Sequence, residues 1–411
     1  MSHYRRTTCC ICGSADLREI LKMPPVPVSP NTGRSSDADG PPMSIPLDVY
    51  FCPVCSHVQL VDILSPELQY TDYRYTTSIS LGLAAHFRSL YAYAMDAVAP
   101  QPGALVVEIG SNDGTVLSYF REGGMRVLGI DPAKSIAAAA TERGIETIAD
   151  FFTSSLSSAI RAQHGSASIV IANNVLANID DPNEVVAGVT SLLADDGAFI
   201  FETQYGIDVF ENNLIDTIYH EHISYFTVAS CERLLERNGL SIQKVERIAI
   251  KGGSIRVTAR KKTDGMIPDP GVAELLRRER DLGYDKVDRY LAFADAASHQ
   301  RARFAALIDD IVAGDGEVAA FGASVGCVTL LHYLGLTGKV AFIVDDNPLV
   351  DVLRGPGYAI PVMPPSVLRE RRPAAVVILA WRYAAPIMQK HAFYKDSGGR
   401  FLIPLPTIEQ S

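Results

Sequence analysis

The sequence contains neither a long apolar run nor a recognisable secretion signal. No uninterrupted apolar stretch in its 411 residues approaches the ~20 residues that a membrane-spanning helix needs. The N-terminal Met-Ser-His-Tyr-Arg-Arg is not followed by the apolar core of a signal peptide. We therefore expect a soluble, cytoplasmic protein without a membrane partner.

The chain also lacks an excess of basic residues. Its formal net charge is −10 at pH 7, which argues against a nucleic-acid partner, because affinity for nucleic acids depends on clustered Lys and Arg. One basic cluster, Arg277-Arg278-Glu279-Arg280, contains an acid and is typical of the solvated face of a helix. The apolar fraction of 47% is ample for buried cores, and the length predicts two or three globular domains.

Cysteine is scarce beyond residue 55, where only Cys231 and Cys327 occur, and each is expected to be a small buried apolar residue. The other five of the seven cysteines include two Cys-x-x-Cys pairs about 40 residues apart. In a chain without a secretion signal such pairs predict a closed structural zinc site rather than disulfides. The predicted ligands are Cys9, Cys12, Cys52 and Cys55, with Cys10 as a bystander and His57 as a less favoured alternative.

A complete G-x-G-x-x-G motif is missing as well, although a glycine turn follows a strand pattern at residues 106–115. This segment predicts a buried strand, a tight turn and the start of a helix. A dinucleotide site would normally have glycine in place of Asn112, because only a residue without a side chain lets the backbone approach the pyrophosphate closely. S-adenosylmethionine has no pyrophosphate, and its cationic methionine end suits carboxylates such as Glu108 and Asp113. We predict a methyl-donor site around Gly110, with a purely structural crossover as the alternative.

The region around this turn keeps an α/β rhythm. Strand patterns alternate with helical stretches, which predicts a mostly parallel, Rossmann-like sheet with ligands at the carboxyl ends of the strands. Asp131 ends the second strand, about 20 residues beyond the turn, where an acid can take ribose hydroxyls. The expected strands are residues 105–109, 126–130, 145–148, 169–172 and 198–201.

Further polar and aromatic residues follow the third and fourth strands. Asp150, Phe151 and Phe152 combine an acid with rings that suit adenine, and Asn173 can face the ligand from the next strand end. Loop capping explains these residues nearly as well.

Residues 216–226 hold a cluster that core packing does not require. Tyr219, His220, Glu221 and His222 belong to a stretch with two imidazoles, a carboxylate and two phenols in seven positions. After this cluster, residues 242–259 predict a hairpin around Lys-Gly-Gly-Ser, and residues 272–310 predict a charged helical spacer.

The last part of the chain starts a second α/β unit. Residues 318–326 predict a strand and a glycine turn that includes Ser324, and residues 340–345 predict a strand that ends in Asp345, where a ribose-binding acid would lie. A further strand is expected at residues 374–381. The alternative is a structural echo of the first unit without a ligand.

Two phenols, Tyr73 and Tyr75, precede an amphipathic helical run at residues 81–98. They are either packing residues or residues that close over a site. We expect three domains: a zinc-binding module at 1–70, an S-adenosylmethionine domain with its helical connector at 71–265, and a C-terminal Rossmann-like domain at 266–411.

Together these motifs make the chain resemble the sugar C-methyltransferases that act on nucleotide-linked 4-keto deoxysugars, the tetronitrose-pathway group. The resemblance spans essentially the whole chain and rests on the cysteine pairs, Val-Glu-Ile-Gly-Ser-Asn-Asp-Gly-Thr, Tyr-His-Glu-His, Gly-Gly-Ser and the C-terminal Phe-Gly-Ala-Ser. It implies structural zinc, S-adenosylmethionine as donor, and a C-terminal domain that helps to hold the substrate's nucleotide. The implied reaction is methylation of C3 of a dTDP-4-keto deoxysugar through an enolate, in antibiotic deoxysugar biosynthesis.

The resemblance also implies roles for individual residues. Tyr219, Glu221 and His222 would line the active site, joined by Tyr73 or Tyr75. A carbon beside a ketone must lose a proton before it can accept a methyl group, and His222 is the candidate base, oriented by Glu221. Tyr219 would donate to the ketone oxygen as charge develops there. The residues expected on the substrate side are Asn178, Lys251, Gly252, Ser254, Ser324 and Asp345.

The chain departs from the family pattern at Asn178, where the family usually has histidine. Asparagine can hydrogen-bond but cannot move a proton near neutral pH. This leaves room for a variant substrate, or for a bifunctional enzyme of a mycarose-type pathway that also reduces the 4-keto group with NADPH. Two other classes stay open: a nicotinamide-dependent sugar oxidoreductase, against which the incomplete glycine motifs speak, and a non-catalytic zinc scaffold, which would not explain the Tyr-His-Glu-His cluster.

Overall fold

The computed structural model of the protein describes residues 3–28, 43–71, 83–347 and 360–411. Tyr73 and Tyr75 lie outside the described residues. The chain divides into two compact units. Unit 1 comprises Met1–Arg18, Tyr50–Asp208 and Glu221–Val287, and unit 2 comprises Glu19–Val49, Val209–His220 and Asp288–Ser411.

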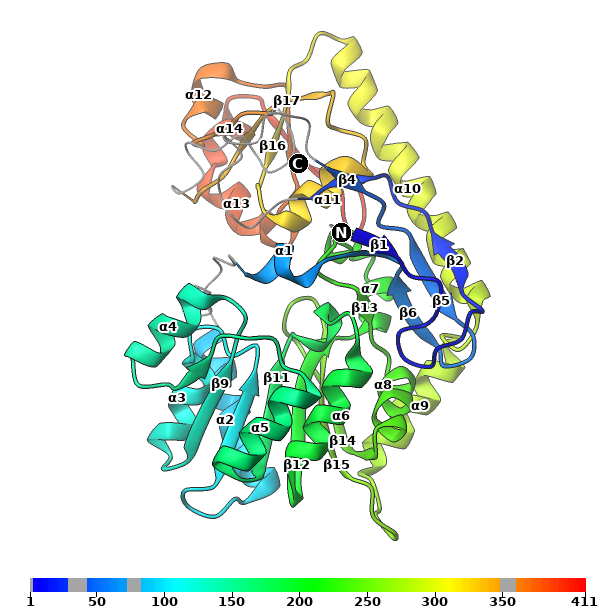
Figure 1. The fold of residues 1–411 in the computed structure, drawn as a ribbon. Coiled ribbons are helices and arrows are strands. Elements are labelled where there is room, and N and C mark those ends of the chain that lie inside the picture. The colour runs from blue at the N-terminus through cyan, green and yellow to red at the C-terminus, as the bar shows by residue number, and fades with distance from the viewer. Residues whose placement is uncertain (1–2, 29–42, 72–82, 348–359) are drawn as a thin grey trace. The chain divides into compact units, whose positions relative to one another are not determined.

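A seven-stranded sheet runs through unit 1 (Figure 1). Its order is β10-β9-β8-β11-β12-β15-β14, with parallel pairing from β10 to β12 and antiparallel pairing of β15 with both neighbours. The prediction of a mostly parallel α/β sheet is thereby confirmed. The strands are β8 (Leu105–Ile109), β9 (Arg126–Ile130), β10 (Thr147–Ile148), β11 (Ala167–Asn173), β12 (Leu193–Gln204), β14 (Leu240–Ile248) and β15 (Ser254–Lys261).

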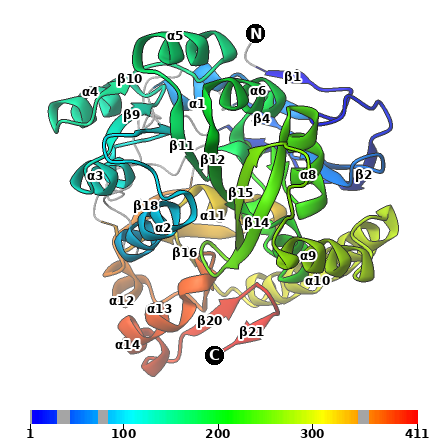
Figure 2. The ribbon, with the colours of Figure 1, turned by 90° about the horizontal axis from the view of Figure 1, so that it is seen from below.

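Helices cover both faces of this sheet (Figure 2). On one face Phe87 of α2 and Phe120 of α3 pack with alternate strand residues such as Ile169 and Ile171. On the other face lie α5 and α6. Burial of both faces explains why the central strands are apolar runs rather than alternating patterns. The helices are α2 (Leu83–Val98), α3 (Thr115–Glu122), α4 (Lys134–Glu142), α5 (Ser154–His164) and α6 (Pro182–Leu192).

The predicted hairpin joins β14 to β15. Lys251, Gly252 and Gly253 at its turn have positive φ angles of 51°, 87° and 121°. A Cβ on Gly253 would lie 2.3 Å from Asp208 Oδ2, so this position requires glycine for space as well as for its backbone.

The region expected to be a charged helical spacer forms two helices, α9 (Pro270–Asp281) and α10 (Val287–Ala313). The three arginines of the basic cluster are exposed, as expected of a solvated face. Glu279 is instead buried, and it accepts hydrogen bonds from the backbone N–H groups of Val228 (2.6 Å) and Ala229 (3.0 Å). Its carboxylate therefore complements the N-terminus of α8 (Val228–Arg237).

The N-terminal part of unit 1 adds short strands. β1 (His3–Arg5) pairs with β7 (Asp62–Leu64), and β6 (His57–Leu60) pairs with β13 (Ser224–Tyr225), both antiparallel. The strand after the Tyr-His-Glu-His cluster is thus an edge of the small N-terminal sheet. The other elements of this part of unit 1 are β5 (Val49–Cys52) and α1 (Pro66–Tyr70), whereas β2 (Arg18–Leu21) belongs to unit 2 except for its first residue.

Unit 2 contains a second α/β sheet, as predicted. Its order is β18-β17-β16-β19-β20-β21, and β20 with β21 forms its antiparallel pair. None of the helices in the described ranges combines the length and apolar character that a membrane-spanning segment requires. The elements of this sheet and its helices are β16 (Val318–Phe321), β17 (Val340–Val344), β18 (Val362–Met363), β19 (Ala375–Ile378), β20 (Arg400–Ile403), β21 (Glu409–Gln410), α11 (Val325–Tyr333), α12 (Val367–Arg371), α13 (Ala384–Lys390) and α14 (Ala392–Asp396).

Candidate functional site

A cavity of about 610 Å³ lies at the carboxyl ends of the parallel strands in unit 1. Ile109, Ile130 and Asn173, the last residues of β8, β9 and β11, form part of its wall. This is the edge at which parallel α/β sheets bind ligands. Eight of the nine residues predicted to bind the methyl donor line it: Glu108, Gly110, Asn112, Asp131, Asp150, Phe151, Phe152 and Asn173.

Asp131 holds the glycine turn together as well as lining the cavity. Its Oδ2 accepts a hydrogen bond from the Asn112 backbone N–H (2.8 Å), and its Oδ1 accepts one from Ala133 N–H (2.9 Å). Burial raises the pKa of Asp131, while these two N–H groups oppose the rise. Each carboxylate oxygen keeps a second lone pair, so contacts with ribose hydroxyls are compatible with the turn.

Glu108 lines the cavity with a carboxyl group that is 2% exposed. Its Oε1 accepts a long hydrogen bond from Asn173 Nδ2 (3.4 Å), and its Oε2 has no partner among the described residues. Burial raises the pKa of Glu108 well above its usual range, and the charges of Asp113 and Asp131 raise it further. A buried carboxylate without a counter-charge is costly, so this position suits a cationic ligand such as the methionine end of S-adenosylmethionine.

Asp113, the ninth predicted donor residue, is not among the residues that line the cavity. Its Oδ1 accepts hydrogen bonds from Thr115 N–H (3.2 Å) and Thr115 Oγ (2.6 Å). The carboxylate therefore serves the first turn of α3, which begins after Gly114 without a side-chain cap of its own. Direct contact of Asp113 with a donor stays a prediction.

The aromatic pair predicted for adenine is unequally placed. Phe152 is 7% exposed, and a Cβ on Gly188 of α6 would lie 3.0 Å from its ring, so this side chain fills the space beside that helix. Phe151 is only partly buried, and its backbone N–H donates to Asp150 Oδ1 (2.8 Å). Phe151 is thus the ring more available to a ligand.

Of the residues predicted on the substrate side, Asn178 and Lys251 line the cavity. Asn178 ends a short 3₁₀ turn, and its Oδ1 is buried without a partner among the described residues. Burial lowers the pKa of Lys251, while Glu202 and Glu221 oppose this shift. Lys251 is at the same time an exposed residue, so it lies at the solvent side of the cavity wall.

Gly252 and Ser254 have structural roles in the hairpin. Gly252 provides one of the positive φ angles at its tip. Ser254 is fully buried, and its Oγ donates to Ile250 O (3.2 Å), which closes the turn. Contact of either residue with a substrate stays a prediction.

The Tyr-His-Glu-His cluster spans a unit boundary: Tyr219 and His220 belong to unit 2, and Glu221 and His222 to unit 1. None of the four is among the residues that line the cavity of unit 1. His220 is buried in unit 2, where its Nε2 lies 3.2 Å from Ile45 O. The structure therefore leaves the catalytic roles of this cluster as predictions.

In unit 2 the two remaining residues that were predicted to bind the substrate, Ser324 and Asp345, stabilise a glycine turn. Ser324 caps α11 by accepting a hydrogen bond from Cys327 N–H. Asp345 accepts hydrogen bonds from Ala323 N–H (2.8 Å) and Asn347 N–H (2.9 Å). Both side chains stabilise the turn itself, and their contact with a nucleotide stays a prediction.

Four cysteines of unit 1 converge as a metal site requires. The Sγ atoms of Cys9, Cys12, Cys52 and Cys55 lie within 4.8 Å of one another, and the Cys9–Cys55 and Cys12–Cys52 pairs are 3.5 Å apart. Tetrahedral zinc with Zn–S bonds of about 2.3 Å needs sulfur separations of about 3.8 Å. The donor set fits closed, structural zinc, with no ligand position left for water.

Cys10 and His57 lie outside this cluster. Cys10 Sγ is 3.7 Å and His57 Nε2 is 3.1 Å from Ser224 Oγ. Burial raises the pKa of Cys10 to about 11 and lowers the pKa of His57 to about 3. Both side chains are therefore neutral near pH 7 and form part of the packing around β13.

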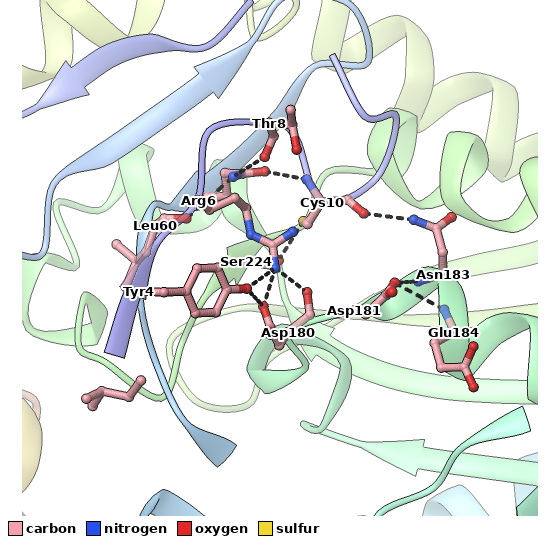
Figure 3. A network of polar contacts seen from close by, with 12 residues as sticks. Tyr4, Arg6, Thr8, Cys10, Leu60, Asp180, Asp181, Asn183, Glu184 and Ser224 are labelled. Atoms are coloured by element: carbon pink, nitrogen blue, oxygen red, sulfur yellow. Dashed lines mark hydrogen bonds and ion pairs between the residues drawn. The ribbon is translucent and has the colours of Figure 1, made fainter. Parts of the chain in front are cut away.

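A polar network connects the cysteine module to the loop beside Asn178, within unit 1 (Figure 3). Arg6 donates to Asp180 O (2.7 Å) and pairs with the Asp180 carboxylate, which also accepts from Tyr4 Oη (2.6 Å). Asn183 Nδ2 donates to Cys10 O (2.7 Å). Because Asp180 also lines the cavity, the cysteine module supports one wall of the cavity.

Sequence reasoning missed an ionic cluster beside the cavity. His86 of α2 lines the cavity, and its Nε2 lies 2.6 Å from Oε2 of the fully buried Glu202 in β12. Oε1 of Glu202 accepts a hydrogen bond from Arg256 Nε (2.8 Å). Glu202 stands opposite Asn173 in the register of β11 and β12. Glu202 directly follows the expected strand at residues 198–201, and ligands bind at the carboxyl ends of such strands, so the sequence could have indicated this residue. No sequence pattern marks His86.

Three family models match successive parts of the chain. A zinc-binding domain matches residues 9–70, a methyltransferase domain matches residues 84–245, and a C-methyltransferase C-terminal domain matches residues 249–406. The first includes the four-cysteine cluster, and the second includes most of the cavity wall. None of the three describes a nicotinamide-binding domain, so the NADPH-dependent alternatives gain no support.

One relative matches over nearly its whole length. C-methyltransferase NovU from Streptomyces niveus is 35% identical over 399 residues, which make up 97% of this chain and 95% of the relative.

Solved methyltransferases resemble only part of the chain. Magnesium protoporphyrin IX methyltransferase from Synechocystis PCC 6803 covers 46% of this chain and 90% of its own, at 16% identity and a TM-score of 0.36. The 1,6-didemethyltoxoflavin-N1-methyltransferase of Burkholderia thailandensis covers 44% of this chain and 80% of its own, at 20% identity and a TM-score of 0.34. TM-scores at this level carry no argument about the site.

Proposed function

Because the chain belongs to the C-methyltransferase family, we propose that it transfers a methyl group from S-adenosylmethionine to a carbon atom of a nucleotide-linked keto sugar. The observation that carries this proposal is the cavity of unit 1, in which the Glu108 carboxyl lacks a counter-charge and Asp131 stands at the next strand end. These two acids match a ligand with a cationic end and a ribose. The donor supplies an electrophilic methyl group on its sulfonium.

Each part of the donor has a counterpart among the cavity residues. Glu108 and Asn173 would take the methionine ammonium, since both offer acceptor oxygens without partners among the described residues. Asp131 would accept the ribose hydroxyls. Phe151, beside Asp150, would lie against the adenine ring.

The acceptor carbon must lose a proton before it can attack the methyl group. The family resemblance assigns this step to His222, with Glu221 to orient it and Tyr219 to donate to the ketone oxygen. Glu221 and His222 belong to unit 1, the unit that holds the cavity, which supports this assignment.

We take the acceptor to be a dTDP-4-keto deoxysugar that is methylated at C3. In unit 2 a glycine turn follows β16, and Asp345 comes directly after β17, where nucleotide-binding sheets place an acid for the ribose; this supports a role of that unit in holding the nucleotide.

The test is an assay of the zinc-loaded protein with S-adenosylmethionine labelled in its methyl carbon and a dTDP-4-keto deoxysugar. We expect NMR to show the labelled methyl group bonded to C3, with an unchanged ketone when NADPH is added. A UDP-linked sugar of the same structure serves as the control for the nucleobase. Methyl transfer to oxygen or nitrogen, or no transfer to any keto sugar by protein that binds the donor, would refute the proposal.

A further inference from the structure

The cysteine module of unit 1, which comprises residues 3–18 and 50–64, reaches a wall of the cavity through Arg6. The backbone N–H of Arg6 donates to Val61 O (2.7 Å), so this residue is fixed to the module. Its side chain is 14% exposed and extends to Asp180, 174 positions further along the chain. There the guanidinium donates to Asp180 O (2.7 Å) and pairs with the Asp180 carboxylate (Figure 3).

The loop that contains Asp180 forms part of the cavity wall. It connects the 3₁₀ turn that ends at Asn178 to α6, and residues 178–181 all line the cavity. Tyr4 Oη also donates to Asp180 Oδ1 (2.6 Å). Burial and this hydrogen bond raise the pKa of Tyr4 to about 12, so its phenol is a neutral donor near pH 7. Two side chains of the cysteine module therefore hold the middle of this loop.

The turn between Cys9 and Cys12 makes a second connection, to the start of α6. Cys10 O accepts a hydrogen bond from Asn183 Nδ2 (2.7 Å), and Ile11 O accepts one from the same nitrogen (3.1 Å). The two acceptor carbonyls lie between two of the predicted zinc ligands. A metal bound at the cluster would therefore restrain the groups that hold the first turn of α6.

The same module pairs with the strand that follows the Tyr-His-Glu-His cluster. Leu60 N–H donates to Ile223 O (2.8 Å), and β6 pairs with β13. The Cys10 N–H donates to Gln59 Oε1 (2.9 Å), which links the cysteine turn to β6. Ile223 directly follows His222, the base in the proposed function. The module thus contacts both segments that the proposed function assigns to the methyl acceptor.

The donor side of the cavity is held by other contacts. Glu108 accepts a hydrogen bond from Asn173 of β11, and Asp131 accepts one from Asn112 of the glycine turn. These residues belong to the seven-stranded sheet and its turns. A change at Arg6 should therefore affect binding of the acceptor more than binding of the donor.

We infer that the cysteine module positions the acceptor side of the site and that Arg6 is a positioning residue, which acts through Asp180; this inference rests on the proposed function. Without Arg6 the loop at residues 178–181 occupies its binding-competent position only part of the time. The apparent affinity for the acceptor falls in proportion to that fraction. A bound acceptor itself keeps the loop in place during the transfer. The KM for the nucleotide-sugar therefore rises, while kcat changes little.

The test compares methyl transfer to the dTDP-4-keto deoxysugar by the zinc-loaded wild type and by Arg6→Met, which keeps the apolar stem and removes the charge. We expect the KM for the sugar to rise about tenfold, near the lower end for a charged hydrogen bond, because the Asp180 carboxylate is 29% exposed. The kcat and the calorimetric affinity for S-adenosylhomocysteine should change by less than about threefold.

Two further variants distinguish positioning from general stability. Arg6→Lys should restore the KM for the sugar, because Arg6 reaches Asp180 and Tyr4 with one nitrogen, Nη2, and its Nε has no partner among the described residues. The matched control is Arg5→Met. Arg5 pairs with Asp62 inside the module (2.5 Å), so this variant should leave the KM values for sugar and donor unchanged.

A double variant tests whether Arg6 acts through Asp180. Asp180→Asn should raise the KM for the sugar by itself. If the two residues act as one unit, Arg6→Met combined with Asp180→Asn should be no worse than the more damaging single variant. Effects that simply add would overturn the action through Asp180.

A wild-type KM for the sugar in Arg6→Met, or a fall in kcat alone, would overturn the role of Arg6 and leave the proposed function intact. Loss of zinc from Arg6→Met would overturn it as well, because Arg6 would then stabilise the module rather than position the acceptor. A wild-type protein that binds both ligands but transfers no methyl group would instead overturn the proposed function. The calorimetric affinity of Arg6→Met for the nucleotide-sugar would then decide the role of Arg6 separately.

Discussion

The glycine turns of the two units have the same backbone plan but different chemistry. In unit 1 Gly110 N–H donates to Ile130 O (2.8 Å), and in unit 2 Gly322 N–H donates to Val344 O (2.8 Å). In both, an aspartate at the end of the second strand accepts a turn N–H at 2.8 Å. The difference lies in the preceding strand, because two residues before the glycine unit 1 has Glu108 and unit 2 has Ala320.

This difference shows that turn geometry alone does not define a ligand. The acid of unit 1, Asp131, is buried beside a second buried carboxyl, which creates a demand for positive charge. Asp345 is only partly buried, and Ser324 already caps the following helix. The first turn therefore suits a cationic donor, and the second suits at most the hydroxyls of a nucleotide.

The largest expected effect comes from the metal, since the cysteine cluster found among the described residues lies in unit 1. Structural zinc contributes about 10 kcal/mol or more to folding of small modules, so Cys52→Ser should unfold the N-terminal module and reduce donor binding only together with it. Metal analysis should give about one zinc per chain. Cys231→Ser, at a buried cysteine outside the cluster, should keep the metal, and less than about half an equivalent in wild-type protein would contradict the site.

The second-largest effect tests the position at which the two turns differ, two residues before the glycine, where unit 1 has Glu108 and unit 2 has Ala320. Glu108→Gln removes the charge that would face the donor ammonium, and loss of one partner of a buried charge pair costs about 2–5 kcal/mol. Calorimetry with S-adenosylhomocysteine, which keeps the ammonium, should show this loss. Unit 2 has Ala320 at the corresponding position, so the control there is Asp345→Asn at the acid of its turn, which should leave the affinity unchanged. Equal effects of both variants would remove the distinction between the turns.

A smaller effect is expected for the acids that the two turns share. Asp131→Asn should weaken donor binding by about 1–3 kcal/mol, the scale of hydrogen bonds to a charged group, because ribose hydroxyls lose a charged acceptor. Asparagine, unlike alanine, can still accept one of the two N–H groups of the turn. Unchanged affinity in a folded Asp131→Asn protein would show that the ribose lies elsewhere.

The smallest expected effect is the release of a proton from Glu108 when the donor binds. The raised pKa of Glu108 means that the free protein holds a proton there at pH values where an exposed glutamate is ionised. A bound cation favours the ionised form, so binding should release up to one proton, and affinity should rise with pH until the free-state pKa is passed. Calorimetry at one pH in buffers of different ionisation enthalpy measures this release. Glu108→Gln should abolish it, and proton uptake by the wild type would contradict the assignment.

The sequence located the repeated elements because their signals are local. The strand patterns at residues 105–109 and 126–130 coincide with β8 and β9, and the glycine turns fall where they were expected. The charged stretch after residue 270 was expected to be helical, and it forms α9 and α10. The buried role of Glu279 could not be predicted, because it depends on the N-terminus of a helix from another part of the chain.

By itself the sequence determined the four-cysteine cluster, the α/β class and the edge of the sheet at which the cavity lies, since short spacings and apolar periodicity encode each of them. The tertiary structure alone decided which polar side chains meet. It assigned Asp113 to the start of α3 rather than to the cavity wall. It also joined His86 to Glu202, 116 positions away in the chain. Contacts between distant segments follow from the packing of helix on sheet, which no local pattern records.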